Sequence, residues 1–173
     1  MANNETYVLF ELAGANYALR SRDVQHIEML EHVTPVPNTV PSVEGVVFSR
    51  GQVIPAMNLR VRFGFPRAPH TMRTRIIIAQ SQQRLVALIV DAAREFRPIP
   101  DEAIRPIEET LTGIDGNYLR GVATVNDRLV LLLNLETVLS PVPEVAKPVS
   151  PDSSRAKPAP VQSRVAQGEP LPF

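Results

Sequence analysis

Three histidines and two aspartates are the side chains of this 173-residue chain best suited to acid–base or metal chemistry. The histidines, His26, His32 and His70, have no partner at the spacing of a metal-ligand motif, so we expect ordinary surface histidines. Asp23 and Asp91 could act together as acid and base. Each follows a predicted strand, however, where aspartate commonly ends or caps local structure, and we favour that structural role.

Signatures of familiar enzyme classes are absent from the sequence. It contains no phosphate-binding glycine loop, no G-x-S-x-G elbow and no H-E-x-x-H pair. It also lacks cysteine, which excludes disulfides, thiolate nucleophiles and Cys-ligated metals and fits a reducing compartment. We therefore expect no catalytic residue, no metal and no cofactor; an enzyme would need a pocket with perturbed acids.

Arginines are unevenly distributed along the chain. Residues 45–90 contain seven arginines, no lysine and no acidic residue, although the whole chain has no net charge. One interpretation is a small β-barrel that binds nucleic acid through this stretch. Stacking aromatics are scarce, however, with three tyrosines, six phenylalanines and no tryptophan. Arginine without lysine is better suited to fixed, planar pairing with carboxylates of a protein partner, so we expect no nucleic acid.

The sequence predicts a soluble, cytoplasmic protein without direct membrane insertion. Its first residues, Met1–Thr6, are polar and lack the basic and apolar regions of a signal peptide. The longest apolar runs, Leu85–Val90 and Leu129–Leu133, are far shorter than the roughly 20 residues that span a bilayer.

A change in composition near Ser140 predicts a folded domain over residues 1–140 and a disordered tail over 141–173. The tail holds eight of the 17 prolines, both lysines and one aromatic residue, Phe173. Such a stretch has too little apolar surface to offset the entropy of ordering it. A frayed spacer is the ordinary interpretation, and a tether for a partner is the alternative.

Residues 1–140 have the pattern of an all-β protein with a few short helices. Alternating apolar residues predict hairpins over 8–19 and 75–90, and the continuous runs 85–90 and 129–133 predict strands covered on both faces. Pro55 predicts that its strand lies at an edge or carries a bulge. Asn58 and Asn134 are expected to cap short helices at 59–63 and 135–139, and one further turn is expected at 101–104. Many short strands favour small closed barrels.

The domain also contains an internal duplication. Gly45–Phe63 aligns without a gap with Gly121–Leu139, and Val8–Phe10 aligns with Ile76–Ile78. We therefore expect two lobes related by a rough twofold axis. The copies differ at one hairpin turn, which is Asn126-Asp127 in the second copy and Arg50-Gly51 in the first. An exposed arginine on rigid β-structure suits a binding interface, although a solvated arginine is the alternative.

The residues around this turn resemble a known family. Gly45–Arg60, GVVFSRGQVIPAMNLR, is similar to the signature of CheW-like coupling proteins: a glycine, an apolar pair, Asn-Leu-Arg-Gly, an apolar strand with proline, and Asp-Leu-Arg. The blocks at 88–91 and 121–135 resemble later parts of the pattern in the same order. This sequence departs from the family pattern at four places. Phe48-Ser49 replaces the usual Asn-Leu, Asn58 replaces the usual Asp, His26 stands where an acidic residue is common, and Ala93 stands where valine is common.

This resemblance implies two intertwined five-stranded β-barrel lobes around a shared core. It implies a non-catalytic adaptor that joins the cytoplasmic tip of chemoreceptors to the regulatory domain of a CheA-type histidine kinase, with a barrel edge on the kinase and the groove between the lobes on the receptor. Core packing or a turn is the alternative for several of the implied partner-binding positions, which are Val24, His26, Gly45, Arg50, Ile76, Ala93 and Phe96.

Overall fold

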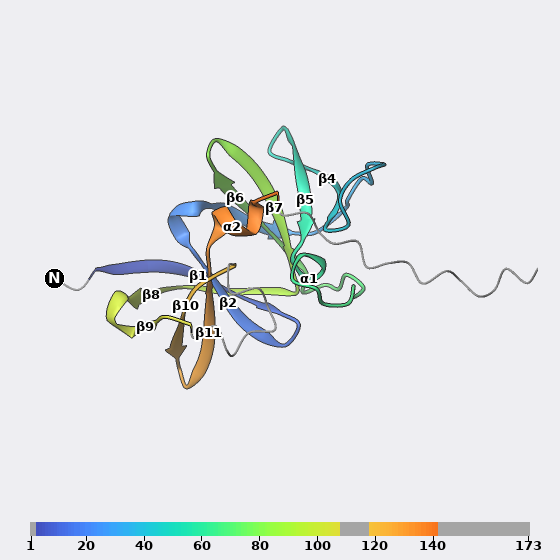
Figure 1. Ribbon diagram of the computed structural model, residues 1–173. Coiled ribbons are helices and arrows are strands. Elements are labelled where there is room, and N and C mark those ends of the chain that lie inside the picture. The colour runs from blue at the N-terminus through green and yellow to red at the C-terminus, as the bar shows by residue number, and fades with distance from the viewer. Residues whose placement is uncertain (1–2, 108–117, 142–173) are drawn as a thin grey trace, which may run out of the picture.

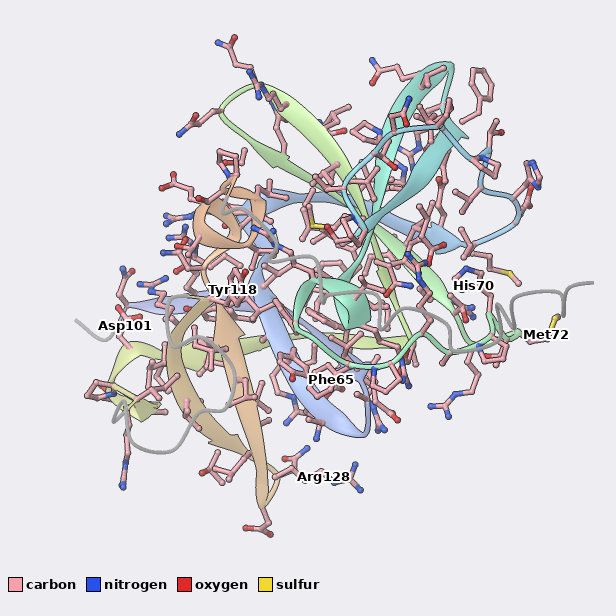
Figure 2. The ribbon with its side chains drawn as sticks, turned by 45° about the vertical axis from the view of Figure 1, so that its right-hand side comes forward. Phe65, His70, Met72, Asp101, Tyr118 and Arg128 are labelled. Atoms are coloured by element: carbon pink, nitrogen blue, oxygen red, sulfur yellow. The ribbon has the colours of Figure 1, made fainter. Side chains whose placement is uncertain are left out.

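The computed structural model describes residues 3–107 and 118–141 (Figure 1). Strands dominate this part of the chain, as predicted, and form two sheets. Apart from Pro141, the tail predicted at 141–173 lies outside the described residues. Among the described residues, no helix has the length and apolar character needed to cross a membrane.

The first sheet has six strands in the order β8-β1-β2-β11-β10-β9. Its strands are β1 (Asn4–Leu12), β2 (Ala15–Arg20), β8 (Ala92–Pro100), β9 (Ile104–Arg105), β10 (Leu119–Val125) and β11 (Arg128–Leu133). We call this sheet and its core lobe A.

The second sheet has five strands in the order β3-β6-β7-β5-β4. They are β3 (Val24–Met29), β4 (Val43–Ser49), β5 (Gln52–Asn58), β6 (Arg75–Ser81) and β7 (Arg84–Val90). We call this sheet and its core lobe B. Figure 1 shows lobe B above and lobe A below, with the short helices α1 (Leu59–Arg62) and α2 (Leu135–Leu139) between them.

The strand order reflects the duplication seen in the sequence. Five strands of lobe A have a counterpart from the other copy in lobe B: β8 corresponds to β3, β1 to β6, β2 to β7, β11 to β5 and β10 to β4. The two sheets therefore have the same strand order, β8-β1-β2-β11-β10 in lobe A and β3-β6-β7-β5-β4 in lobe B. Among the described residues, the only parallel pairing in each sheet joins the two copies: β11 with β2 in lobe A and β5 with β7 in lobe B. Each lobe is thus built from segments of both halves of the chain, and the lobes are intertwined.

The prediction of two closed five-stranded barrels is not confirmed. Among the described residues no backbone pairing joins β3 to β4 or β8 to β9, so each sheet is open. Lobe A has six strands because β9 adds a short pairing to β10. The sheets curl nonetheless, because side chains from opposite sides of each sheet meet: His26 of β3 contacts Ser49 of β4, and Arg97 of β8 contacts Asn126 in the β10–β11 turn.

The apolar core has three parts. One cluster, including Tyr7 and Leu132, lies within lobe A, and another, including Val47 and Ile78, lies within lobe B. The largest cluster is shared between the lobes. It contains a chain of neighbouring aromatic rings with centroids 5.3–5.8 Å apart, and its members are Phe10, Tyr17, Phe63 and Tyr118. Burial of such large side chains is the main stabilising contribution, which fixes the lobes against each other.

Local signals produced the expected caps and turns. The Asn58 side chain accepts hydrogen bonds from the amides of Arg60 and Val61, and the Asn134 side chain accepts one from Thr137, so both short helices begin as predicted. The predicted turn after Pro100 is a single 3-10 turn, Asp101–Ala103.

Within residues 3–107 and 118–141, four two-residue hairpin turns have positive φ at both positions: Ala13-Gly14, Arg50-Gly51, Gln82-Gln83 and Asn126-Asp127. Such turns match the twist of the strands that they connect.

Two strand predictions were wrong in detail. Pro55 lies in β5, an interior strand, and the nearest register shift of the β4–β5 pair falls at Val43/Gly45 rather than at the proline. The proline is tolerated because β5 pairs with β7 only from Ala56 onward, so its missing N–H interrupts no ladder on that side. Leu129 is 67% exposed because β11 extends beyond the shared core at its first residues, so the run 129–133 is not covered throughout.

Candidate partner-binding site

Arg50 is presented at the tip of the β4–β5 hairpin. Its backbone has φ 47° and that of Gly51 has φ 81°, so both turn residues are in the left-handed region. The Arg50 side chain is exposed, and within the described part of the chain it makes no hydrogen bond or ion pair. At the matching turn of the second copy, the Asn126 side chain accepts a hydrogen bond of 3.0 Å from Arg97. The arginine is thus free where its counterpart is engaged.

An exposed apolar surface flanks this arginine. Phe48 on β4 and Val53 on β5 are directly opposite each other in the strand register and are 75% and 67% exposed. Val46 and Pro55 form the next pair on the same outward face, and Pro55 is exposed as well. We call these four side chains the hairpin face. A cation beside an apolar surface is a combination typical of the energetically important part of a protein interface.

His26 lies close to the same hairpin but is not freely exposed. Its side chain is 12% exposed, and Nε2 lies 3.1 Å from the Ser49 hydroxyl and 3.6 Å from a Glu28 carboxylate oxygen. The expectation of a surface histidine was therefore wrong at this position, because the ring fills the space between β3 and β4. His70 meets the expectation better: it is 41% exposed and lies 3.1 Å from Glu44.

Gly45 is buried and belongs to the packing of lobe B. A Cβ atom at this position would lie 2.0 Å from the Thr34 carbonyl oxygen, because the chain at Thr34–Pro35 crosses directly over it. Two backbone hydrogen bonds of 2.8 and 2.9 Å join Thr34 to Val46 beside it. Gly121 has the same role in the other copy, where a Cβ would lie 2.9 Å from the Arg105 carbonyl oxygen. The sequence-aligned glycines are therefore crossing points of the backbone.

The remaining predicted binding residues occupy both lobes. Val24 is partly buried against the shared core, and Ile76 is 3% exposed in the core of lobe B. Ala93 and Phe96 lie on β8 in lobe A, where Phe96 is 59% exposed and Ala93 is partly buried. The structure thus brings Arg50 and His26 into one neighbourhood and places Phe96 on a separate exposed strand at the end of the other sheet.

Most arginines of the 45–90 stretch are used inside the fold. Arg62 is buried, donates to the carbonyl oxygens of Val138 and Ser140 at the end of α2, and lies over the Tyr118 ring. The other engaged arginines contact carboxylates or carbonyls, and they are Arg60, Arg67, Arg73 and Arg75. Arg50 and Arg84 are the two without such a contact in the described residues. Phosphate binding along the whole stretch would compete with these contacts, which weakens the nucleic-acid alternative.

Asp91 ties three elements together at the junction of the lobes. Its carboxylate accepts two hydrogen bonds from Arg60, of 2.8 and 2.7 Å, and one of 2.8 Å from the backbone N–H of Ala13. Burial by itself would raise the pKa of Asp91, but the hydrogen bonds from Arg60 and Ala13 and the charges of Arg60 and Arg73 outweigh it and lower that pKa.

An anion held in this way is a structural group rather than a proton donor, as the sequence predicted. Asp23 is likewise paired, with Arg20 at 3.1 Å. The partnership of Asp91 with Arg60 itself was not predicted. The one sequence feature that pointed to this ion pair was the place of Arg60 at the second position of the helix that Asn58 caps.

Surface hollows of the described residues offer little to a metal ion or a substrate. A hollow of about 320 Å³ beside Asp91 also contains Glu11, Arg60 and Arg73, all of which are ion-paired. A second, of about 340 Å³, is lined by His32, His70, Glu31 and Glu44 among others. No group of three or more His, Asp or Glu side chains in residues 3–107 and 118–141 is arranged to hold a metal ion.

Comparison with known proteins gives a consistent result. A sequence profile of the CheW-like domain matches residues 6–142. The chain is 29% identical over 136 residues to the chemotaxis protein CheW of Klebsiella aerogenes, which covers 79% of this chain and 82% of that protein. It is also 29% identical over 135 residues to the chemotaxis protein CheW of Bacillus subtilis, covering 78% and 86%.

A solved structure resembles the whole arrangement. The crystal structure of the scaffolding protein TtCheW from Thermoanaerobacter tengcongensis has a TM-score of 0.73 and 30% sequence identity, and the match covers 81% of this chain and 90% of that one. The likeness therefore extends through both lobes rather than one.

Proposed function

This chain belongs to the CheW-like domain family, and from that membership we propose that it is a non-catalytic adaptor that couples chemoreceptors to a CheA-type histidine kinase. The adaptor acts in a bacterial chemosensory array on the cytoplasmic side of the membrane. Related proteins named for chemotaxis, and one named as a scaffold, support this role.

The observation that carries the proposal is the unpaired Arg50 beside the hairpin face. In the described residues five of the seven arginines in the 45–90 stretch have internal partners. Of the other two, Arg50 and Arg84, we single out Arg50 because it lies beside the exposed pair Phe48 and Val53. The hairpin face adds exposed apolar surface from Phe48 and Val53. We assign the regulatory domain of the kinase to this site, with a carboxylate against Arg50 and apolar side chains against the hairpin face.

The receptor is assigned to the junction of the two lobes. There, Arg60 and Asp91 join α1 to the end of β7, and Phe96 is exposed farther along β8. A helical receptor tip could contact both lobes at once at this place. Because the adaptor holds kinase and receptor together, a change in one partner alters the other through coupled binding, without bond chemistry in the adaptor.

The proposal is tested by isolating complexes from purified components. The adaptor should bind the regulatory domain of a CheA-type kinase encoded in the same genome, and it should not hydrolyse ATP alone. Failure to bind any such kinase or receptor would refute the adaptor role. The nucleic-acid alternative predicts retention of a single-stranded oligonucleotide at low salt with a steep loss as salt rises. No retention at low salt would eliminate it.

A further inference from the structure

The tip of the β4–β5 hairpin has few backbone restraints. Within the described part of the chain, residues 48–53 pair only within the hairpin, because β5 joins β7 from Ala56 onward and the bridge from Thr34 reaches β4 at Val46. Inward packing of Val47 and Ile54 anchors the base of the hairpin in the core of lobe B. An isolated two-stranded ribbon is only marginally stable in water, so something else must hold the tip in place.

A side-chain contact supplies that restraint. His26, on the strand at the opposite end of the sheet, places Nε2 3.1 Å from the hydroxyl oxygen of Ser49, the residue directly before Arg50. Ser49 is 4% exposed, so this contact is shielded from competing water. Burial strengthens a satisfied hydrogen bond and makes its loss costly.

The surroundings of the ring indicate which nitrogen carries the proton. Nδ1 is buried, and no hydrogen-bond partner for it exists among the described residues. Nε2 faces the Ser49 hydroxyl and, at 3.6 Å, a carboxylate oxygen of Glu28, which can only accept. A proton on Nε2 can therefore be donated, whereas one on Nδ1 would be buried without an acceptor. We take Nε2–H as the donor to Ser49.

The matching hairpin tip of the second copy is held by a different side-chain contact. At its matching tip the restraint comes from β8, where Arg97 donates to the side chain of Asn126, the turn residue itself. The positions that match His26 and Ser49 are Arg94, which pairs with Glu11, and Val125, which has no hydroxyl. In the first copy the contact lies one residue before the turn, so the turn side chain, Arg50, is left free.

We propose that His26 is a positioning residue. Its hydrogen bond to Ser49, which we call the clasp, spans the open side of lobe B and fixes the hairpin tip that presents Arg50. His26 thus acts on partner binding through Ser49, and its ring does not itself contact the partner. The link to partner binding rests on the proposed function; the clasp itself does not.

Hydrogen exchange on the protein alone tests the clasp without any partner. Ser49→Ala removes the hydroxyl with little change of volume, and we expect amide exchange over residues 48–53 to become about fivefold faster, the effect of one net hydrogen bond. His26→Ala should give the same increase, and the double variant should exceed neither single variant. His26→Gln, which keeps an N–H donor, should restore much of the protection. Arg97→Ala should affect residues 124–128 and leave 48–53 unchanged.

Titration with the kinase regulatory domain then tests the consequence. We expect Ser49→Ala and His26→Ala to weaken binding to a similar extent, each less than Arg50→Ala, because they only loosen the tip. Unchanged exchange at residues 48–53 in Ser49→Ala would overturn the clasp. Weaker binding in His26→Ala with unchanged exchange would make His26 a direct contact residue and also overturn it. If the wild-type protein binds no kinase, the proposed function fails while the exchange result still decides the clasp.

Discussion

Replacing Arg50 by alanine separates a binding role from a structural one. The side chain is exposed and has no polar contact in the described residues, so its removal takes nothing from the fold. Arginine and alanine both carry a Cβ at φ 47°, so the cost of the left-handed backbone is common to both. We expect the free energy of unfolding in urea to change by less than about 0.5 kcal/mol.

The same substitution should weaken binding of the kinase regulatory domain by about 2 kcal/mol or more, as truncation of an arginine at the centre of an interface does. That loss corresponds to roughly a 30-fold higher Kd in a calorimetric titration. Arg84 is the matched control, because it is also exposed, makes no polar contact with the described residues and follows the turn of the β6–β7 hairpin. Arg84→Ala should change neither quantity.

Three results would refute this reasoning. A large loss of stability in Arg50→Ala would mean that the side chain supports the fold. Equal affinities of the wild type, Arg50→Ala and Arg84→Ala would mean that the kinase binds elsewhere. A loss of affinity in Arg84→Ala as large as that in Arg50→Ala would point to a general effect of positive charge, and lower sensitivity of both variants to salt would identify it.

Three further predictions follow from other parts of the structure. Gly45→Ala should destabilise the protein by more than about 3 kcal/mol or prevent folding, because its Cβ would overlap the Thr34 carbonyl, whereas Gly51→Ala, at φ 81° with open space around it, should cost only about 1 kcal/mol in a urea melt. Asp91→Asn should lower stability at pH 7 by about 1–2 kcal/mol. Because the folded-state pKa of Asp91 is lowered, the stability that its carboxylate contributes is complete above the unfolded pKa near 3.9 and is lost as pH falls through the folded pKa. Urea melts from pH 7 to pH 2 should therefore show the stabilities of the wild type and Asp91→Asn converging in acid. A difference in stability that stays constant with pH would contradict this. Truncation after Ser140 should leave the thermal midpoint nearly unchanged, since it keeps the carbonyls that Arg62 binds, and a large decrease would show that the removed residues pack on the domain.

Local features of the fold were predictable because their causes are local. The caps by Asn58 and Asn134 depend on a side chain and amides two or three residues away. The turn at Asn126-Asp127 depends on the left-handed tolerance of those two residues. The gapless alignment of Gly45–Phe63 with Gly121–Leu139 identified the two copies, and the strand orders of the sheets agree with it.

Features that depend on distant pairing were not predictable from the sequence. Whether a sheet closes depends on pairing between the strands at the two ends of its strand order. Hydrophobic periodicity identifies individual strands but does not show which distant strands pair. The contact of His26 with Ser49 joins residues 23 apart on such strands, so the sequence gave no sign that the His26 side chain is partly buried. Pro55 was assigned to an edge or bulge because the sequence does not reveal that the parallel pairing of β5 begins one residue later.

The exchange of strands between the copies also governs how the chain can fold. Lobe A is complete only when β11, which ends at residue 133, pairs with β2, and in lobe B the second edge of β5 stays open until β7 pairs with it. The first copy alone therefore cannot finish either lobe during synthesis, and the open edges of β2 and β5 are exposed to wrong partners until strands of the second copy are made. Contacts so distant in sequence imply slow folding. Both lobes should therefore form and unfold in a single transition, with the same midpoint for probes placed in either one.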